Sequence, residues 1–134
     1  MRTSGDLKVQ EKRYFTLEEA NQCIPELVDE ISLLRAIRAQ LAGLHAEITP
    51  LLEVVSSNGG SKHTAALLNA TKRFQEILDR IEARGCHLKG LDPGLVDFPH
   101  LRNGKEVYLC WRMGEKSIRY WHEIEDGFEG RQPL

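Results

Sequence analysis

Residues 94–123 constrain the architecture more than any other part of this 134-residue chain; they read GLVDFPHLRNGKEVYLCWRMGEKSIRYWHE. Apolar and polar side chains alternate along much of this stretch, which is typical of strands with one buried face. We predict strands over residues 95–98, 106–113 and 117–123. The Asn103-Gly104 pair favours a type I′ turn between the first two of these strands.

A further short strand is expected over residues 86–89, before these three. The segment 86–124 is therefore predicted to form an antiparallel meander of three or four strands. Residues 1–13 and 126–134 are predicted to be irregular tails, the second because it contains two glycines and a proline.

The chain before the sheet is predicted to be helical between residues 16 and 85. Thr16 and Glu19 fit a capping box, in which the Thr16 hydroxyl accepts from the Glu19 amide and the Glu19 carboxylate accepts from the Thr16 amide. Apolar residues then follow at steps of three and four, which is one face of a helix. They are Ile24, Leu27, Ile31, Leu34, Ile37, Leu41, Leu44, Ile48, Leu51 and Val55.

Two prolines fall inside this first helix. Pro25 removes an amide hydrogen bond, so we expect a kink or a restart within residues 21–25. Pro50 follows Thr49, which can cap a restarted helix.

A second helix is predicted over residues 62–84, after a loop at residues 58–61. Gly85 suits the C-terminal cap of this helix. The two helices are expected to form a long antiparallel hairpin.

The lengths of the two helices predict an uncovered surface. The first would extend about 40 residues, or roughly 60 Å at 1.5 Å per residue, and the second a little over half of that. Folded back, the second helix would reach only residues 35–57. The apolar stripe from Ile24 to Leu34 would then need another cover. We expect both the sheet and a second copy of the chain to cover it, which predicts a homodimer through the helical hairpin.

The composition limits the class of protein. A chain of this length fits a single domain, here residues 1–134. The net charge of −2 argues against a nucleic-acid-binding face. No apolar run approaches the roughly 18 residues of a membrane span, and the N-terminus has no signal-peptide pattern. Three widely spaced cysteines fit a reducing compartment, so a cytoplasmic location is expected.

Several strings of residues carry a family resemblance that covers nearly the whole chain. They are Tyr14-Phe15-Thr16-Leu17-Glu18-Glu19-Ala20-Asn21, Pro25-Glu26-Leu27, Gly94-Leu95-Val96-Asp97-Phe98-Pro99, Tyr108-Leu109-Cys110-Trp111-Arg112, Gly114-Glu115, Tyr120-Trp121-His122-Glu123 and Gly130-Arg131. The chain resembles a prokaryotic family known as domain of unknown function 2203. It departs from the family pattern at Lys89-Gly90-Leu91-Asp92, where the family often has Lys-Asp. The resemblance supports the architecture and implies no activity.

A metal site is one candidate, and it depends on the register of the last two strands. A two-residue loop at Gly114-Glu115 puts Cys110 and His122 on opposite faces, whereas a three-residue loop puts them on one face. With His87 or His100, these two could then approach the ligand set of zinc. The chain has no CxxC or HxxxH pair. A nucleophilic role for Cys110 is disfavoured, because the cysteine lies within a strand and not at a helix N-terminus.

A second candidate is a pocket for a small anionic or aromatic ligand on the C-terminal sheet. Tryptophans near arginines and carboxylates can bind such a ligand by stacking and by bidentate pairing. The candidate residues are Asp97, Trp111, Arg112, Glu115, Arg119, Trp121, His122 and Arg131. The same residues could instead form an ion-pair network that fixes the sheet to the first helix.

The sequence thus predicts an α+β protein with a long, kinked helical hairpin followed by a small antiparallel sheet. The favoured function is a non-catalytic, cytosolic, homo-oligomeric interaction or scaffold module. The alternative is a small-ligand-binding protein or minor enzyme with its site on the sheet. No cofactor, nucleic acid or membrane partner is predicted.

Overall fold

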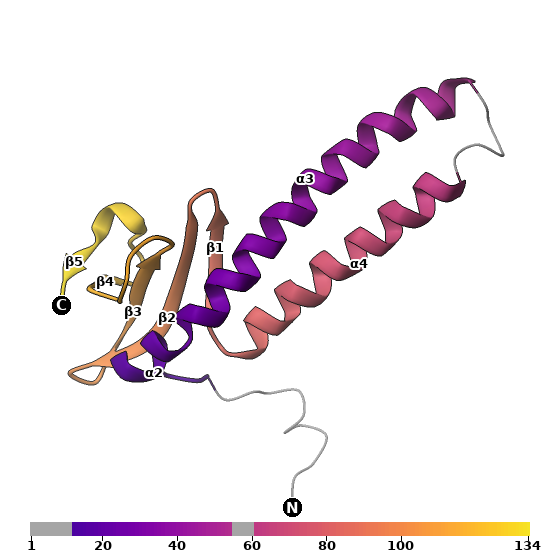
Figure 1. Cartoon of the computed structure of the whole chain (residues 1–134). Helices are drawn as coiled ribbons and strands as arrows, with labels where there is room; N and C mark the ends of the chain where they lie inside the picture. Colours follow the sequence, from indigo (N-terminus) through magenta and orange to yellow (C-terminus); the bar gives the residue numbers. More distant parts are fainter. Residues whose placement is uncertain (1–11, 55–60) are drawn as a thin grey trace, which may run out of the picture.

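The computed structural model describes residues 12–54 and 61–134, without the side chains of residues 45–54 and 61. Within these residues the protein is α+β, with three helices followed by a sheet (Figure 1). The helices are α2 (Leu17–Gln22), α3 (Ile24–Val54) and α4 (Ser61–Ala83). The strands are β1 (His87–Leu91), β2 (Gly94–Arg102), β3 (Lys105–Arg112), β4 (Tyr120–Glu123) and β5 (Gln132–Pro133), with a 3₁₀ turn, η1 (Phe128–Gly130), before the last. The expected loop at residues 58–61 lies almost wholly outside the described residues.

The sheet has five strands in the order β1-β2-β3-β4-β5, and every neighbouring pair is antiparallel. The prediction of three or four strands was therefore wrong, because β5 lies in the expected irregular tail. This strand has only two residues, too few to show an alternating pattern. One of them is Pro133, whose missing N–H suits an edge strand.

The turn between β2 and β3 confirms the predicted hairpin. Asn103 and Gly104 have φ angles of 53° and 80°, the positive values that a type I′ turn requires. Arg102 pairs with Lys105 across the turn. Such a two-residue turn fixes which residues oppose one another along both strands.

The capping box at Thr16 is present. The Glu19 amide donates to the Thr16 hydroxyl at 3.0 Å, and the Thr16 amide donates to the Glu19 carboxylate at 2.9 Å. The helix that begins here is divided at Cys23, between α2 and α3. Pro25 occupies the first turn of α3, where a missing N–H removes no helical bond. The backbone of α3 continues through Pro50 to Val54.

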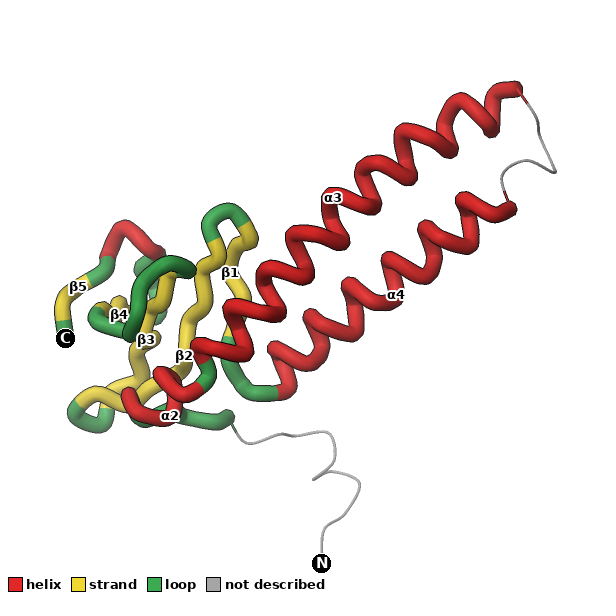
Figure 2. The backbone as a smooth tube through the Cα atoms, viewed as in Figure 1, coloured by secondary structure: helices red, strands yellow, loops and turns green. Residues whose placement is uncertain are grey.

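Helices α3 and α4 lie side by side and run in opposite directions (Figure 2). Arg84, just after α4, contacts Glu30 through both terminal guanidinium nitrogens, one of them 2.7 Å from the Glu30 carboxylate. The second helix and the residue that follows it therefore reach further along the first than the expected limit of residue 35. No helix in the described part of the chain has the length and apolar content of a membrane span.

The sheet covers the apolar stripe of α3. Leu27, Ile31 and Leu34 are fully buried. A Cβ built on Gly94 of β2 would lie 3.1 Å from Ile31, so sheet and helix are in close contact there. Intrachain packing thus buries the surface that had suggested a second copy, and the homodimer stays a prediction.

The two faces of the sheet differ. The inner face packs against the helices and contains Val96, Phe98, Val107, Leu109, Trp111 and Trp121. Phe15, which precedes α2, meets the ring of Phe98 edge-on with centroids 5.2 Å apart. The outer face contains the alternate residues, and the candidate site lies there.

Candidate functional site

The pairing of β3 with β4 places Cys110 and His122 on the same face. Tyr108 is opposite His122, and Cys110 is opposite Tyr120. This is the face relationship expected for the three-residue loop, although the connection between the strands covers residues 113–119. The outer face therefore presents both potential metal ligands.

Asp97 completes a cluster with these two residues. It lies on β2 directly opposite Cys110. The carboxylate, the Cys110 sulfur and a ring nitrogen of His122 all lie within 4.8 Å of one another. The three residues are only 5%, 2% and 2% exposed, respectively, so three potential ligands from three adjacent strands converge in a buried place.

The hydrogen bonds of His122 orient its ring toward Asp97. Nδ1 lies 2.8 Å from the carbonyl oxygen of Glu123, so this nitrogen carries a proton and donates it. Nε2 lies 3.1 Å from Asp97 Oδ1. A carboxylate oxygen is an acceptor, so a proton or a cation must lie between these two atoms for them to attract one another.

Cys110 is held as a thiol. Burial, reinforced by the negative charge of Asp97, raises its pKa to about 11. A thiolate is the nucleophilic form, so the site as it stands does not favour covalent catalysis by this residue. A divalent cation bound here would stabilise the negatively charged thiolate of Cys110.

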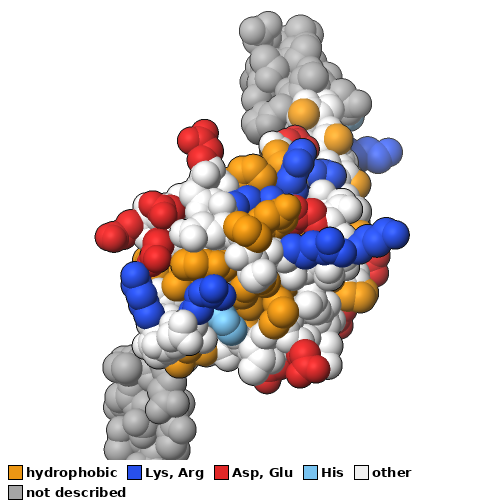
Figure 3. Space-filling view, turned by 90° about the vertical axis from the view of Figure 1, so that its left-hand side faces the viewer, with side chains coloured by type: hydrophobic (Ala, Val, Ile, Leu, Met, Phe, Trp, Pro, Cys, Tyr) orange, Lys and Arg blue, Asp and Glu red, His pale blue; other side chains and the backbone are white. Residues whose placement is uncertain are grey.

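A cavity of about 140 Å³ opens beside the cluster, and Asp97 and Cys110 form part of its wall. Leu95, Lys89 and Tyr108 extend that wall along the sheet. The segment after β4 forms the opposite wall with Ile124, Asp126, Gly127 and Phe128. Figure 3 views the molecule from the sheet end and shows hydrophobic side chains together with Lys and Arg side chains on the face at that end.

Arg131 fastens the C-terminal segment to the sheet. Its guanidinium carbon lies 4.1 Å from the ring centroid of Tyr120 and 4.5 Å from that of Phe128. One terminal nitrogen donates to the Glu115 carboxylate at 2.8 Å and to the Cys110 carbonyl at 3.2 Å. Arg131 therefore joins the segment over the cavity to the backbone of the strand beneath it.

A second hydrogen bond holds the Glu115 carboxylate in place beside Arg131. The carboxylate also accepts from the Arg112 backbone N–H at 2.7 Å. Burial acts to raise the pKa of Glu115, but the bonds from Arg131 and Arg112 outweigh burial, and the pKa lies below its ordinary value.

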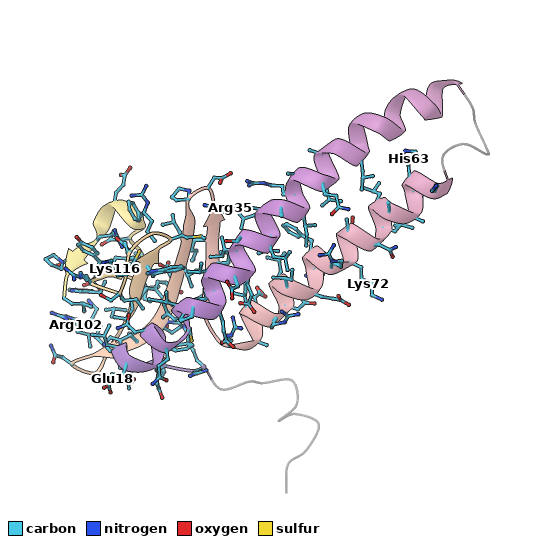
Figure 4. All side chains as sticks on the ribbon, in the orientation of Figure 1. Glu18, Arg35, His63, Lys72, Arg102 and Lys116 are labelled. Carbon is cyan, nitrogen blue, oxygen red and sulfur yellow. The ribbon has the colours of Figure 1, made fainter. Side chains whose placement is uncertain are left out.

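The other predicted site residues do not join the cluster. Trp111 and Trp121 lie on the inner face, where the Trp111 ring nitrogen donates to the Glu115 carbonyl at 2.9 Å. Arg102 covers the Trp121 ring at 4.5 Å and is labelled in Figure 4 at the sheet end of the molecule. The side chains of Arg112 and Arg119 are exposed. The eight predicted residues therefore do not form one pocket.

Neither of the additional histidines joins the three-residue cluster. His100 Nδ1 lies 2.7 Å from the carbonyl oxygen of Phe15. His87 meets the Tyr108 ring edge-on. The missed partner was Asp97, assigned earlier only to the ligand pocket. The predicted turn at Asn103-Gly104 was the signal, since its register already puts Asp97 opposite Cys110.

The fold and the cluster define an α+β protein with a pair of long helices against a five-stranded antiparallel sheet. The outer face of the sheet contains three buried residues that could bind a metal ion. The chain belongs to the family described as "Uncharacterized conserved protein (DUF2203)", whose model matches residues 13–134. No curated protein and no solved structure matches the chain.

Proposed function

We propose that this protein binds a single transition-metal ion, with zinc as the best fit, through Asp97, Cys110 and His122. The convergence of one carboxylate, one sulfur and one imidazole within 4.8 Å, all buried, carries the proposal. Zinc takes these three ligand types, and sites with three protein ligands leave a fourth position open.

The distances fit such an ion after small side-chain movements. Zinc bonds of about 2.0–2.3 Å in a tetrahedron separate ligand atoms by roughly 3.3–3.8 Å. The Asp97 and His122 atoms are 3.1 Å apart, and no ligand pair exceeds 4.8 Å. The Nδ1 bond of His122 to a carbonyl oxygen is the arrangement that metal-binding histidines usually have, because it fixes the tautomer with Nε2 free to bind.

The charges also match a divalent ion. The Asp97 carboxylate and a Cys110 thiolate supply two negative charges, and His122 binds as a neutral ring. A divalent cation balances them in a buried setting where an uncompensated charge would be costly. All three cysteines are free. A cytoplasmic, reducing location, which we propose with this function, would keep Cys110 available.

Metal content is the direct test. The purified protein, stripped with a chelator and then reloaded, should bind one equivalent of Zn²⁺. Loaded instead with Co²⁺, it should show the strong near-ultraviolet absorption of a cobalt–thiolate bond. Cys110→Ser should abolish this band and His122→Gln should weaken binding at least 10-fold. Cys23→Ser is the matched control, because Cys23 is distant from the cluster in sequence and only half-buried. A cobalt–thiolate band that survives Cys110→Ser would overturn the proposal.

As a second function we propose self-association through α3 and α4, joined as a helical hairpin. A hollow of about 330 Å³ is lined by Leu44 of α3 and by Lys62, His63 and Ala66 of α4. Leu68, elsewhere on α4, is 64% exposed. A second copy of the chain would bury the exposed Leu68 side chain. Light scattering should show a dimer that Leu68→Glu dissociates, whereas Leu101→Glu at the sheet end should not. A monomer at micromolar concentration would contradict this idea.

A further inference from the structure

The cavity adjoins the proposed metal site. Asp97 and Cys110 belong both to the cluster and to the cavity wall. We propose that the cavity binds a small monocarboxylate, whose carboxylate group reaches the metal and whose short chain fills the space beneath the C-terminal segment. This inference rests on the proposed function and adds the chemical class of its ligand.

The volume sets the size of the ligand. Cavities of roughly 150 Å³ accommodate a molecule the size of benzene, which has six non-hydrogen atoms. The cavity here measures about 140 Å³. A carboxylate with about four carbons has six non-hydrogen atoms and matches that size. A carboxylate with a longer alkyl chain would extend out of the cavity.

The lining suits a molecule with one apolar and one anionic part. Leu95 on the sheet and Ile124 and Phe128 on the opposite wall offer apolar contact. Both Ile124 and Phe128 are 39% exposed, so this wall lies at the surface, where a ligand can enter. Apolar walls with a few convergent polar groups are the usual form of a small-molecule site.

Lys89 provides the charge that favours an anion. With a divalent ion bound, Asp97 and a Cys110 thiolate leave the site neutral, so an incoming carboxylate needs a further positive charge. Lys89 lines the cavity, and its ammonium group lies 5.4 Å from the ring centroid of Tyr108.

Asp126 is an opposing charge on the wall, in addition to the proposed metal ligand Asp97. Its Oδ2 atom lies 3.1 Å from where a Cβ on Gly130 would be, so the carboxylate lies against its own segment. Asp126→Asn should therefore change carboxylate binding less than a substitution of Lys89 does.

The experiment uses the Co²⁺-loaded full chain and three probes, acetate, butyrate and octanoate. Each is titrated while the visible cobalt spectrum is recorded, since a new ligand on the metal changes it. We expect saturable changes, with butyrate binding more tightly than either of the other two. Lys89→Met should weaken butyrate binding about 10-fold while cobalt stoichiometry stays at one. Leu95→Trp should fill the cavity and remove the response without removing the metal.

The outcomes separate this inference from the proposed function. A protein that fails to bind cobalt contradicts both. A protein that binds cobalt through Cys110 but shows no change with any carboxylate keeps the metal site and rejects the ligand. Tightest binding of octanoate, unaffected by Leu95→Trp, would mean surface adsorption and would equally reject it.

Discussion

The Nε2 atom of His122 lies 3.1 Å from the Oδ1 atom of Asp97, although 25 residues separate the two in the chain. Both side chains are buried. The two atoms attract one another only if a proton or a cation lies between them. The sheet creates this requirement by placing β2 and β4 on either side of β3. Metal binding is one way to satisfy it, and stability measurements can detect that binding.

Zinc should therefore stabilise the folded protein. A ligand at 100 times its dissociation constant adds about 2.7 kcal/mol, which for a chain of this size is a rise in Tm on the order of 10 °C. We expect this rise in the wild type and in Cys23→Ser, and none in Asp97→Asn. Thermal unfolding with zinc and with a chelator provides the measurement. An equal rise in Asp97→Asn would place the metal elsewhere.

The buried carboxylate of Glu30 should matter for stability. It is 8% exposed on its side chain and pairs with Arg84 at the junction of α3 and α4. Glu30→Gln leaves the guanidinium without its buried partner and should lower the free energy of unfolding by about 3 kcal/mol. Glu26→Gln is the control, because Glu26 pairs with the same arginine at 3.5 Å but is 70% exposed. Its effect should stay under about 1 kcal/mol, and equal losses in urea unfolding would refute this account.

Two glycines should respond oppositely to alanine. A Cβ on Gly94 would lie 3.1 Å from Ile31 and from Met113, so Gly94→Ala should destabilise the contact between helix and sheet by about 1–3 kcal/mol. A Cβ on Gly43, within α3, would meet nothing within 4 Å. Gly43→Ala should stabilise the helix by about 0.5–1 kcal/mol. Denaturant unfolding of both variants checks the signs, and a stabilised Gly94→Ala would show that Ile31 moves aside easily.

Acid should weaken the attachment of the C-terminal segment. The pKa of Glu115 is lowered in the folded state, so its contribution is present above the unfolded pKa of about 4.3. That contribution is lost as the pH falls through the lower, folded value. The wild type should therefore lose stability between about pH 5 and pH 3 more steeply than Glu115→Gln does. Melting curves across this range test the difference, with Glu129→Gln as a control for charge.

Replacement of Arg131 should loosen the wall of the cavity. Lysine keeps the charge but lacks the planar group that contacts Tyr120 and Phe128, so Arg131→Lys should lose about 1–2 kcal/mol. Limited proteolysis should then cut residues 124–130 faster than in the wild type. Arg119→Lys, at an exposed position, should leave the cleavage rate unchanged. Equal rates for both variants would mean that Arg131 does not hold the segment.

Local sequence signals predicted the parts of this fold that depend on neighbouring residues. The capping box at Thr16 and the turn at Asn103-Gly104 involve atoms only a few residues apart, and both are present. The same turn carried enough register information to pair Asp97 with Cys110.

The parts that sequence reasoning missed depend on distant contacts. The connection over residues 113–119 is held where the Ile118 amide donates to the side chain of Asn21, 97 residues away, at 2.8 Å. Strand β5 exists because residues 132–133 meet β4. Neither contact produces a periodic pattern in the sequence of its own segment, so neither could be predicted from that segment alone.

The alternation of inner and outer residues along β3 has a consequence for mutational surveys of this protein. Substitutions at Val107, Leu109 and Trp111 remove core packing and should reduce the amount of folded protein in the cell. Substitutions at the outer residues Tyr108 and Arg112 should instead leave abundance closer to normal, whereas those at Cys110 should remove the metal and the stability that it adds. A survey that measures abundance and metal content separately should therefore find that the effects of substitution alternate from one residue of β3 to the next. Inner positions should mainly affect abundance, and outer positions should affect it less.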